Sequence, residues 1–74
     1  MTLDGIQKHQ RARIATIDTA MLPLKLLEMG CLPGNEVHLE QRALLNDPMY
    51  LVIDGTHLAI RKETARYITI DIIE

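Results

Sequence analysis

A small, mainly β barrel is the fold class that the sequence predicts, and three observations support it. Within 74 residues, five short stretches have the apolar alternation and β-branched composition of strands. Tight turns rich in Gly, Pro, Asn and Asp separate them. The only real helix candidate, near 23–29, follows the first strand. We therefore predict one domain over 1–74, an SH3-like barrel of about five strands. An OB-type barrel is the alternative, although its helix usually lies between the third and fourth strands.

Each predicted strand alternates apolar with polar residues or is rich in β-branched ones. Their ranges are 12–17, 37–44, 49–54, 57–61 and 68–73. A single helical turn is expected at 62–66. In the second strand, period-2 alternation directs Val37, Leu39 and Ala43 inward and His38, Glu40 and Arg42 outward.

The end of the predicted helix is marked by two consecutive turn signals. Gly30 stands where a helix C-cap requires a left-handed backbone, which places Cys31 and Leu26 in contact in a Schellman ending. Pro33-Gly34 then suits the central positions of a type II turn. Pro23 is a good first helical residue. The segment therefore predicts a sharp change of backbone direction between a short helix and a strand.

Composition and charge exclude several classes of protein. Of the residues, 47% are hydrophobic, yet only two are aromatic, both tyrosines, so the core must be aliphatic. The net charge of −2 disfavours nucleic-acid binding, which draws its affinity from basic surfaces. One cysteine excludes an internal disulfide. No signal peptide and no apolar span of about 18 residues is present, so we expect a cytosolic protein without direct membrane insertion.

The motifs resemble those of the FeoA family, the small cytosolic partner proteins of bacterial ferrous iron transport. Residues 26–34 are similar to the family's LLxxGLxPG segment, and 58–63 to its LALRKE run. Residues 12–14, Val37, 42–44, 47–48 and Ala65 also fit, in the right order. The chain departs from the pattern at 8–10, where Pro-Gly is common, and at Cys31 and Asn46.

The resemblance implies an SH3-like barrel and a role beside FeoB, the membrane protein with a cytosolic GTPase domain that carries ferrous iron inward. We expect a non-catalytic accessory protein that binds and modulates FeoB and requires no cofactor. A related domain forms the C-terminal module of iron-dependent repressors. The alternative is therefore a transition-metal-sensing module that binds ferrous iron weakly.

No pattern of catalytic residues is present. The sequence lacks a P-loop, paired cysteines and a nucleophile elbow. Cys31 follows a helix C-terminus, whose partial negative charge opposes a thiolate, so it is interpreted as a small buried hydrophobic residue.

A metal site would have to be built from histidine and carboxylate. His38 and Glu40 lie two apart on one predicted strand and share a face. With His57 or His9 they could form a weak iron or zinc site. The competing interpretation is a solvated polar face, because no closely spaced set of three or four ligands occurs.

Protein binding is the most natural use of a small barrel with open edges. The apolar residues around the helix are candidates for an exposed patch, although they could instead cover the core. These candidates are Met21, Leu22, Leu26, Met29, Cys31, Leu32 and Pro33. Leu26 is expected to pack on the core and not to belong to an exposed patch. An exposed edge would also permit a homodimer.

Overall fold

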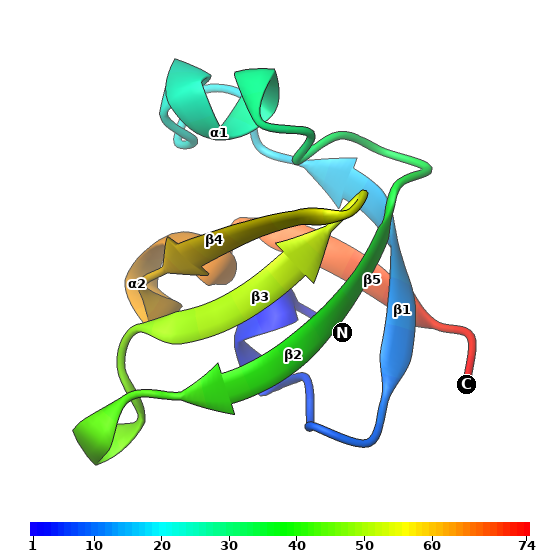
Figure 1. Ribbon diagram of the computed structural model, residues 1–74. Helices are drawn as coiled ribbons and strands as arrows, with labels where there is room; N and C mark the ends of the chain where they lie inside the picture. The colour runs from blue at the N-terminus through cyan, green and yellow to red at the C-terminus, as the bar shows by residue number, and fades with distance from the viewer.

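The chain forms one antiparallel sheet of five strands in a computed structural model that describes residues 1–74. The strands lie in the order β4-β3-β2-β1-β5. The sheet that they form is strongly curled (Figure 1). The strands are β1 (Arg11–Ile17), β2 (Glu36–Arg42), β3 (Met49–Ile53), β4 (Thr56–Ile60) and β5 (Ile68–Ile72). Two α-helices are present, α1 (Leu24–Glu28) and α2 (Lys62–Ala65). Two 3₁₀ turns, η1 (Leu3–Gly5) and η2 (Leu44–Asn46), complete the chain.

The predicted fold class is confirmed, and the five expected strands are present to within two residues at their ends. The short helix after the first strand and the single turn at α2 are also as predicted. The β3–β4 turn is displaced by one residue. It is formed by Asp54 and Gly55, at φ of 49° and 79°, so Thr56 already belongs to β4. An Asp-Gly pair is favoured in such two-residue hairpins.

The outward direction predicted for Arg42 is wrong. The register of β2 against β3 shifts between Leu39 and Gln41, and such a bulge changes which face later side chains reach. Arg42 is half-buried, and its Nη2 donates to the carbonyl oxygens of Asp4 and Ile6, both at 3.0 Å. Ala43 and Leu44, which were expected within the strand, lie beyond its end.

The core is aliphatic, as the composition predicts, and it contains no buried polar or charged residue. The N-terminal segment contributes more than its sequence indicates. Leu3 and Ile6 are both fully buried, and Thr2 forms a β-bridge with Thr69 beside the sheet. No periodic pattern marks this segment, because a single 3₁₀ turn is too short to show one.

The Arg42 contacts generate a prediction about stability. Replacing Arg42 with Met should lower the free energy of unfolding by about 1–3 kcal/mol, since two part-buried carbonyls lose their donor. Lys8, which is exposed and makes no side-chain hydrogen bond or ion pair, provides the matched control Lys8→Met. Urea denaturation measures both. Equal stability of the two variants would show that packing alone holds the N-terminal segment.

Candidate functional site

The C-terminus of α1 closes as a Schellman motif, which confirms the sequence prediction. The N–H of Cys31 donates to the carbonyl of Leu26 at 3.0 Å, and the N–H of Gly30 to that of Leu27 at 3.2 Å. Gly30 has φ +104°, a conformation that side chains with a Cβ disfavour. The last helical carbonyls are thus satisfied, and the chain reverses within two residues.

The Pro33-Gly34 turn forms as predicted and is bound to β1. Asn35 N–H donates to the Leu32 carbonyl at 3.2 Å, and Gly34 has φ +95°. Gly34 N–H donates to Ile14 O at 2.8 Å, and Ile14 N–H donates to Asn35 O at 2.9 Å. These bonds fix the turn to the first strand.

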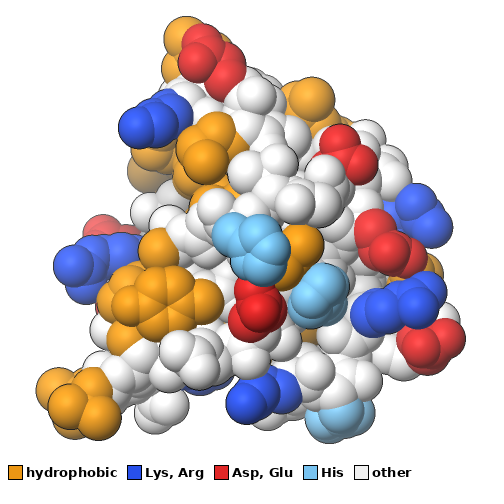
Figure 2. Space-filling view, in the orientation of Figure 1, with side chains coloured by type: hydrophobic (Ala, Val, Ile, Leu, Met, Phe, Trp, Pro, Cys, Tyr) orange, Lys and Arg blue, Asp and Glu red, His pale blue; other side chains and the backbone are white.

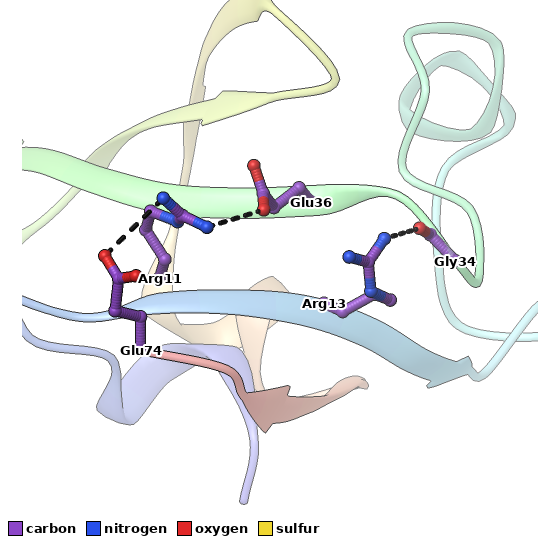
Figure 3. A network of polar contacts seen from close by, with 5 residues as sticks. All are labelled: Arg11, Arg13, Gly34, Glu36 and Glu74. Atoms are coloured by element: carbon purple, nitrogen blue, oxygen red, sulfur yellow. Dashed lines mark hydrogen bonds and ion pairs between the residues drawn. The ribbon is translucent and has the colours of Figure 1, made fainter.

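Side chains reinforce this attachment (Figure 3). The Arg13 guanidinium donates to Gly34 O at 2.9 Å. Beside it, Arg11 approaches Glu36 at 3.3 Å and Glu74 at 3.5 Å. Asn35 Nδ2 donates to Gly30 O at 2.7 Å and so joins the two turns directly. We call the segment 30–35 the corner.

The structure divides the residues predicted for partner binding into three groups by their exposure to solvent. Leu22 and Cys31 are buried, so neither side chain can be offered to a partner. Leu26 and Met29 are half-buried and pack against the core. Met21, Leu32 and Pro33 are exposed.

Leu24, which the sequence analysis did not single out, is 67% exposed on the first turn of α1. No local signal in the sequence marked it, because Leu24 lies three residues before Leu27 and so shares a helix face with a residue that packs on the core. Around α1, apolar side chains gather at the top of the molecule in Figure 2. We call Met21, Leu24, Leu32 and Pro33 the apolar rim.

A groove of about 290 Å³ runs between α1, β4 and α2. The outline of the molecule is indented there, at the left of Figure 2. Its two cations are Lys25, which makes no ion pair, and Arg61, whose Nη1 lies 3.8 Å from Asp47. The lining residues of this α1–β4 groove are Pro23, Lys25, Leu26, Ala59, Ile60, Arg61 and Thr64.

A second hollow, of about 300 Å³, lies on the outer face of the sheet. Ala59 lines this outer hollow as well as the α1–β4 groove. The outer hollow is lined by Glu40, Tyr50, Leu51, His57, Leu58 and Ala59. The two hollows therefore lie on the two sides of β4.

The predicted metal ligands are only partly brought together. Glu40 Oε1 and His57 Nδ1 are 2.6 Å apart. His38 lies across the sheet from His57, with Val52 of β3 between them in register. No group of three or more His, Cys, Asp or Glu side chains is arranged to hold a metal ion. Glu40 and His57 therefore form a close carboxylate–imidazole pair on the sheet surface.

The largest hollow, about 490 Å³, lies at the end of β1 and is lined mostly by polar groups such as Thr16, Asp18 and Arg66. Arg66 donates to the Tyr67 hydroxyl at 3.0 Å and lies 5.0 Å from its ring centroid. Arg66 and Tyr67 are thus bonded to each other at this hollow.

Known proteins share this curled five-stranded sheet with its helical corner. The family model described as the FeoA domain matches residues 1–72. The chain belongs to the FeoA family. It is thus an iron(II) transport-associated protein, and the family acts as an accessory factor of transport. Among functionally curated proteins, none matches the sequence.

Solved FeoA structures share the fold. The FeoA protein of Chlorobium tepidum is 25% identical and has a TM-score of 0.88. The alignment covers 100% of this chain and 71% of that protein's chain. Iron(II) transport protein A of Clostridium thermocellum is 28% identical and has a TM-score of 0.86. The alignment covers 99% of this chain but only 46% of that protein's chain.

The FeoA of Stenotrophomonas maltophilia, solved with zinc and described as an SH3 domain protein, is 22% identical and has a TM-score of 0.81. The alignment covers 96% of this chain and 89% of that one. None of the helices in the present structure is long and apolar enough to cross a membrane.

The corner generates a prediction about backbone strain. Gly30→Ala should lower the free energy of unfolding by about 1–3 kcal/mol, because alanine is strained at a φ of +104°. The effect is conformational, since an added Cβ would meet its nearest atom at an ordinary 3.7 Å. Gly5→Ala is the control, because its close neighbour is the movable end of Met1. Urea denaturation distinguishes them, and equal losses would contradict this account.

Burial of Cys31 generates a prediction about pH. Desolvation raises the pKa of its thiol from 9.0 to about 11. The unfolded chain therefore loses this proton first, and stability should fall as pH rises from about 9 to about 11. Iodoacetamide should label native protein far more slowly than urea-unfolded protein between about pH 8 and pH 10. Equal labelling rates would show an accessible thiolate.

Proposed function

We propose that this protein is a non-catalytic cytosolic accessory factor of bacterial ferrous iron uptake that binds and modulates FeoB. The observation that carries the proposal is the apolar rim, a group of exposed apolar side chains on the hydrogen-bonded corner and around the start of α1. Leu24, Met21 and Leu32 are 67%, 52% and 43% exposed. Clustered exposed apolar residues of this kind mark protein interaction sites.

The rigidity of the corner supports a binding role. Backbone bonds satisfy the end of α1, and further bonds fix the Pro33-Gly34 turn to β1. A surface that is already ordered loses little conformational entropy when a partner docks on it. Rim residues that need not reorganise are therefore well suited to recognise one shape of a partner.

Modulation then follows from differential affinity. FeoB, as a GTPase-linked transporter, alternates between conformations. A protein that binds one of these conformations more tightly shifts the population toward it by the ratio of the two affinities. Such an effector needs no catalytic group, which agrees with the buried, hard-to-ionise thiol of Cys31.

One observation favours metal sensing as a second candidate function. Glu40 and His57 form a carboxylate–imidazole pair at 2.6 Å on an exposed face, and these are ligand types for Zn²⁺ and Fe²⁺. Calorimetric titration of the isolated protein with Zn²⁺ and Fe²⁺ tests it. Saturable binding that His57→Ala abolishes and His9→Ala retains would support metal sensing, whereas the absence of heat would eliminate it.

Binding of the FeoB cytosolic part to immobilised protein tests the leading proposal. Leu24→Asp should weaken binding at least about tenfold, because it places a charge in the apolar contact. The substitution should leave the fold intact, since an acidic residue is favourable in the first turn of a helix. The measurement is made in the GDP, GTP-analogue and nucleotide-free states.

Leu45→Asp is the matched control. Leu45 is 93% exposed on η2, away from the corner, so its substitution should not change binding. Absence of wild-type binding in every nucleotide state would overturn the proposal. Equal effects of Leu24→Asp and Leu45→Asp on binding would show that the apolar rim is not the surface that contacts FeoB.

A further inference from the structure

Strand β4 is the uncovered edge of the sheet. It is hydrogen-bonded to β3 alone. The opposite edge, β5, is covered by the N-terminal segment, through the Thr2–Thr69 bridge and the bond from Ile70 N–H to Met1 O at 2.8 Å. An open edge presents backbone donors and acceptors on which a further strand can pair.

The hydrogen bonds of β3 show which of its residues face β4. Asp54 N–H donates to Glu36 O at 3.0 Å, so the backbone of Asp54 is directed toward β2. Backbone groups alternate in direction along an antiparallel strand. The backbone groups of Ile53 and Leu51 are therefore directed toward β4.

The same alternation identifies the free groups of β4. Thr56 and Leu58 lie opposite the two residues of β3 that face this strand, so their backbone groups are used in the sheet. His57 and Ala59 alternate with them and direct their backbone groups outward. The edge thus offers two N–H and two C=O groups to an added strand.

The two hollows lie where the side chains of an added strand would go. Side chains of a strand alternate between the two faces of a sheet. Ala59 lines both the α1–β4 groove and the outer hollow. A strand paired beside Ala59 would therefore direct alternate side chains into the two hollows.

The lining of the α1–β4 groove indicates the chemistry of its occupant. Pro23, Leu26 and Ile60 supply apolar walls, and no acidic residue lines the groove. Lys25 has no ion-pair partner, and Arg61 has only the 3.8 Å contact with Asp47. Apolar side chains neighboured by carboxylates complement such a site.

We propose that β4 is a strand-addition site for an extended segment of a partner protein, with apolar and acidic side chains directed into the α1–β4 groove. The proposal deepens the function proposed above and rests on it only for the identity of the protein that carries the segment. Its central element is a pair of backbone hydrogen bonds at Ala59.

Ala59→Pro removes the outward N–H and leaves every bond to β3 in place. Proline is tolerated in edge strands when its missing N–H faces solvent. Lys25→Glu tests the charge of the groove, and Lys8→Glu is its matched control on an exposed turn outside the groove. Circular dichroism and urea denaturation check that each variant is folded.

The probe is a display library of random linear peptides selected on the wild-type protein, with affinities measured by fluorescence anisotropy. Selected peptides should carry both apolar and acidic residues at every second position, the positions whose side chains enter the α1–β4 groove. Ala59→Pro should weaken their binding about tenfold or more. Lys25→Glu should weaken it about threefold, an effect that salt reduces, while Lys8→Glu should have no effect.

Amide exchange of the wild-type complex provides a second measurement that needs no variant. The selected peptide should protect the amides of His57 and Ala59. No selected peptides, binding unchanged by Ala59→Pro, or a β4-paired dimer of this chain that excludes peptide would each overturn the proposal. Peptide capture without FeoB binding would overturn the FeoB function alone, and FeoB binding without peptide capture would overturn strand addition alone.

Discussion

The hydrogen bond from Asn35 Nδ2 to the Gly30 carbonyl, at 2.7 Å, joins the two turns that position the proposed interaction surface. Gly30 ends the Schellman motif of α1, and Asn35 belongs to a turn fixed to β1. A helix of five residues has no stability of its own in water. Its position is therefore set by this corner and by the packing of Leu26 on the core.

The position of α1 in turn creates two features that a bare curled sheet would lack. Met21 and Leu24 are displayed as part of an apolar rim, and the helix forms one wall of a groove along β4. The apolar rim and the groove both arise from where the backbone places ordinary side chains. Neither depends on unusual side-chain chemistry. An accessory factor of transport that works by binding needs no more than such a surface.

Local signals in the sequence predicted most of the fold, and the errors have physical causes. Gly30 and Pro33-Gly34 specify their backbone conformations directly, so the Schellman ending and the type II turn of the corner were both predicted. The direction of Arg42 was missed because a bulge in β2 arises from pairing with β3, which alternation within one strand cannot show. The site was predicted less well, because helix contacts decide that Leu22 is buried and Leu24 exposed. The α1–β4 groove depends on segments distant in sequence and has no local signal.

The central claim is that FeoB contacts the corner side of the barrel. Hydrogen–deuterium exchange of this protein, alone and with the FeoB cytosolic part, tests it most directly. The account predicts slowed exchange over α1 and β4, with no change at η2 or at the Arg66–Tyr67 end of the molecule. Protection confined to η2 or to Arg66 and Tyr67, with α1 and β4 unchanged, would contradict it.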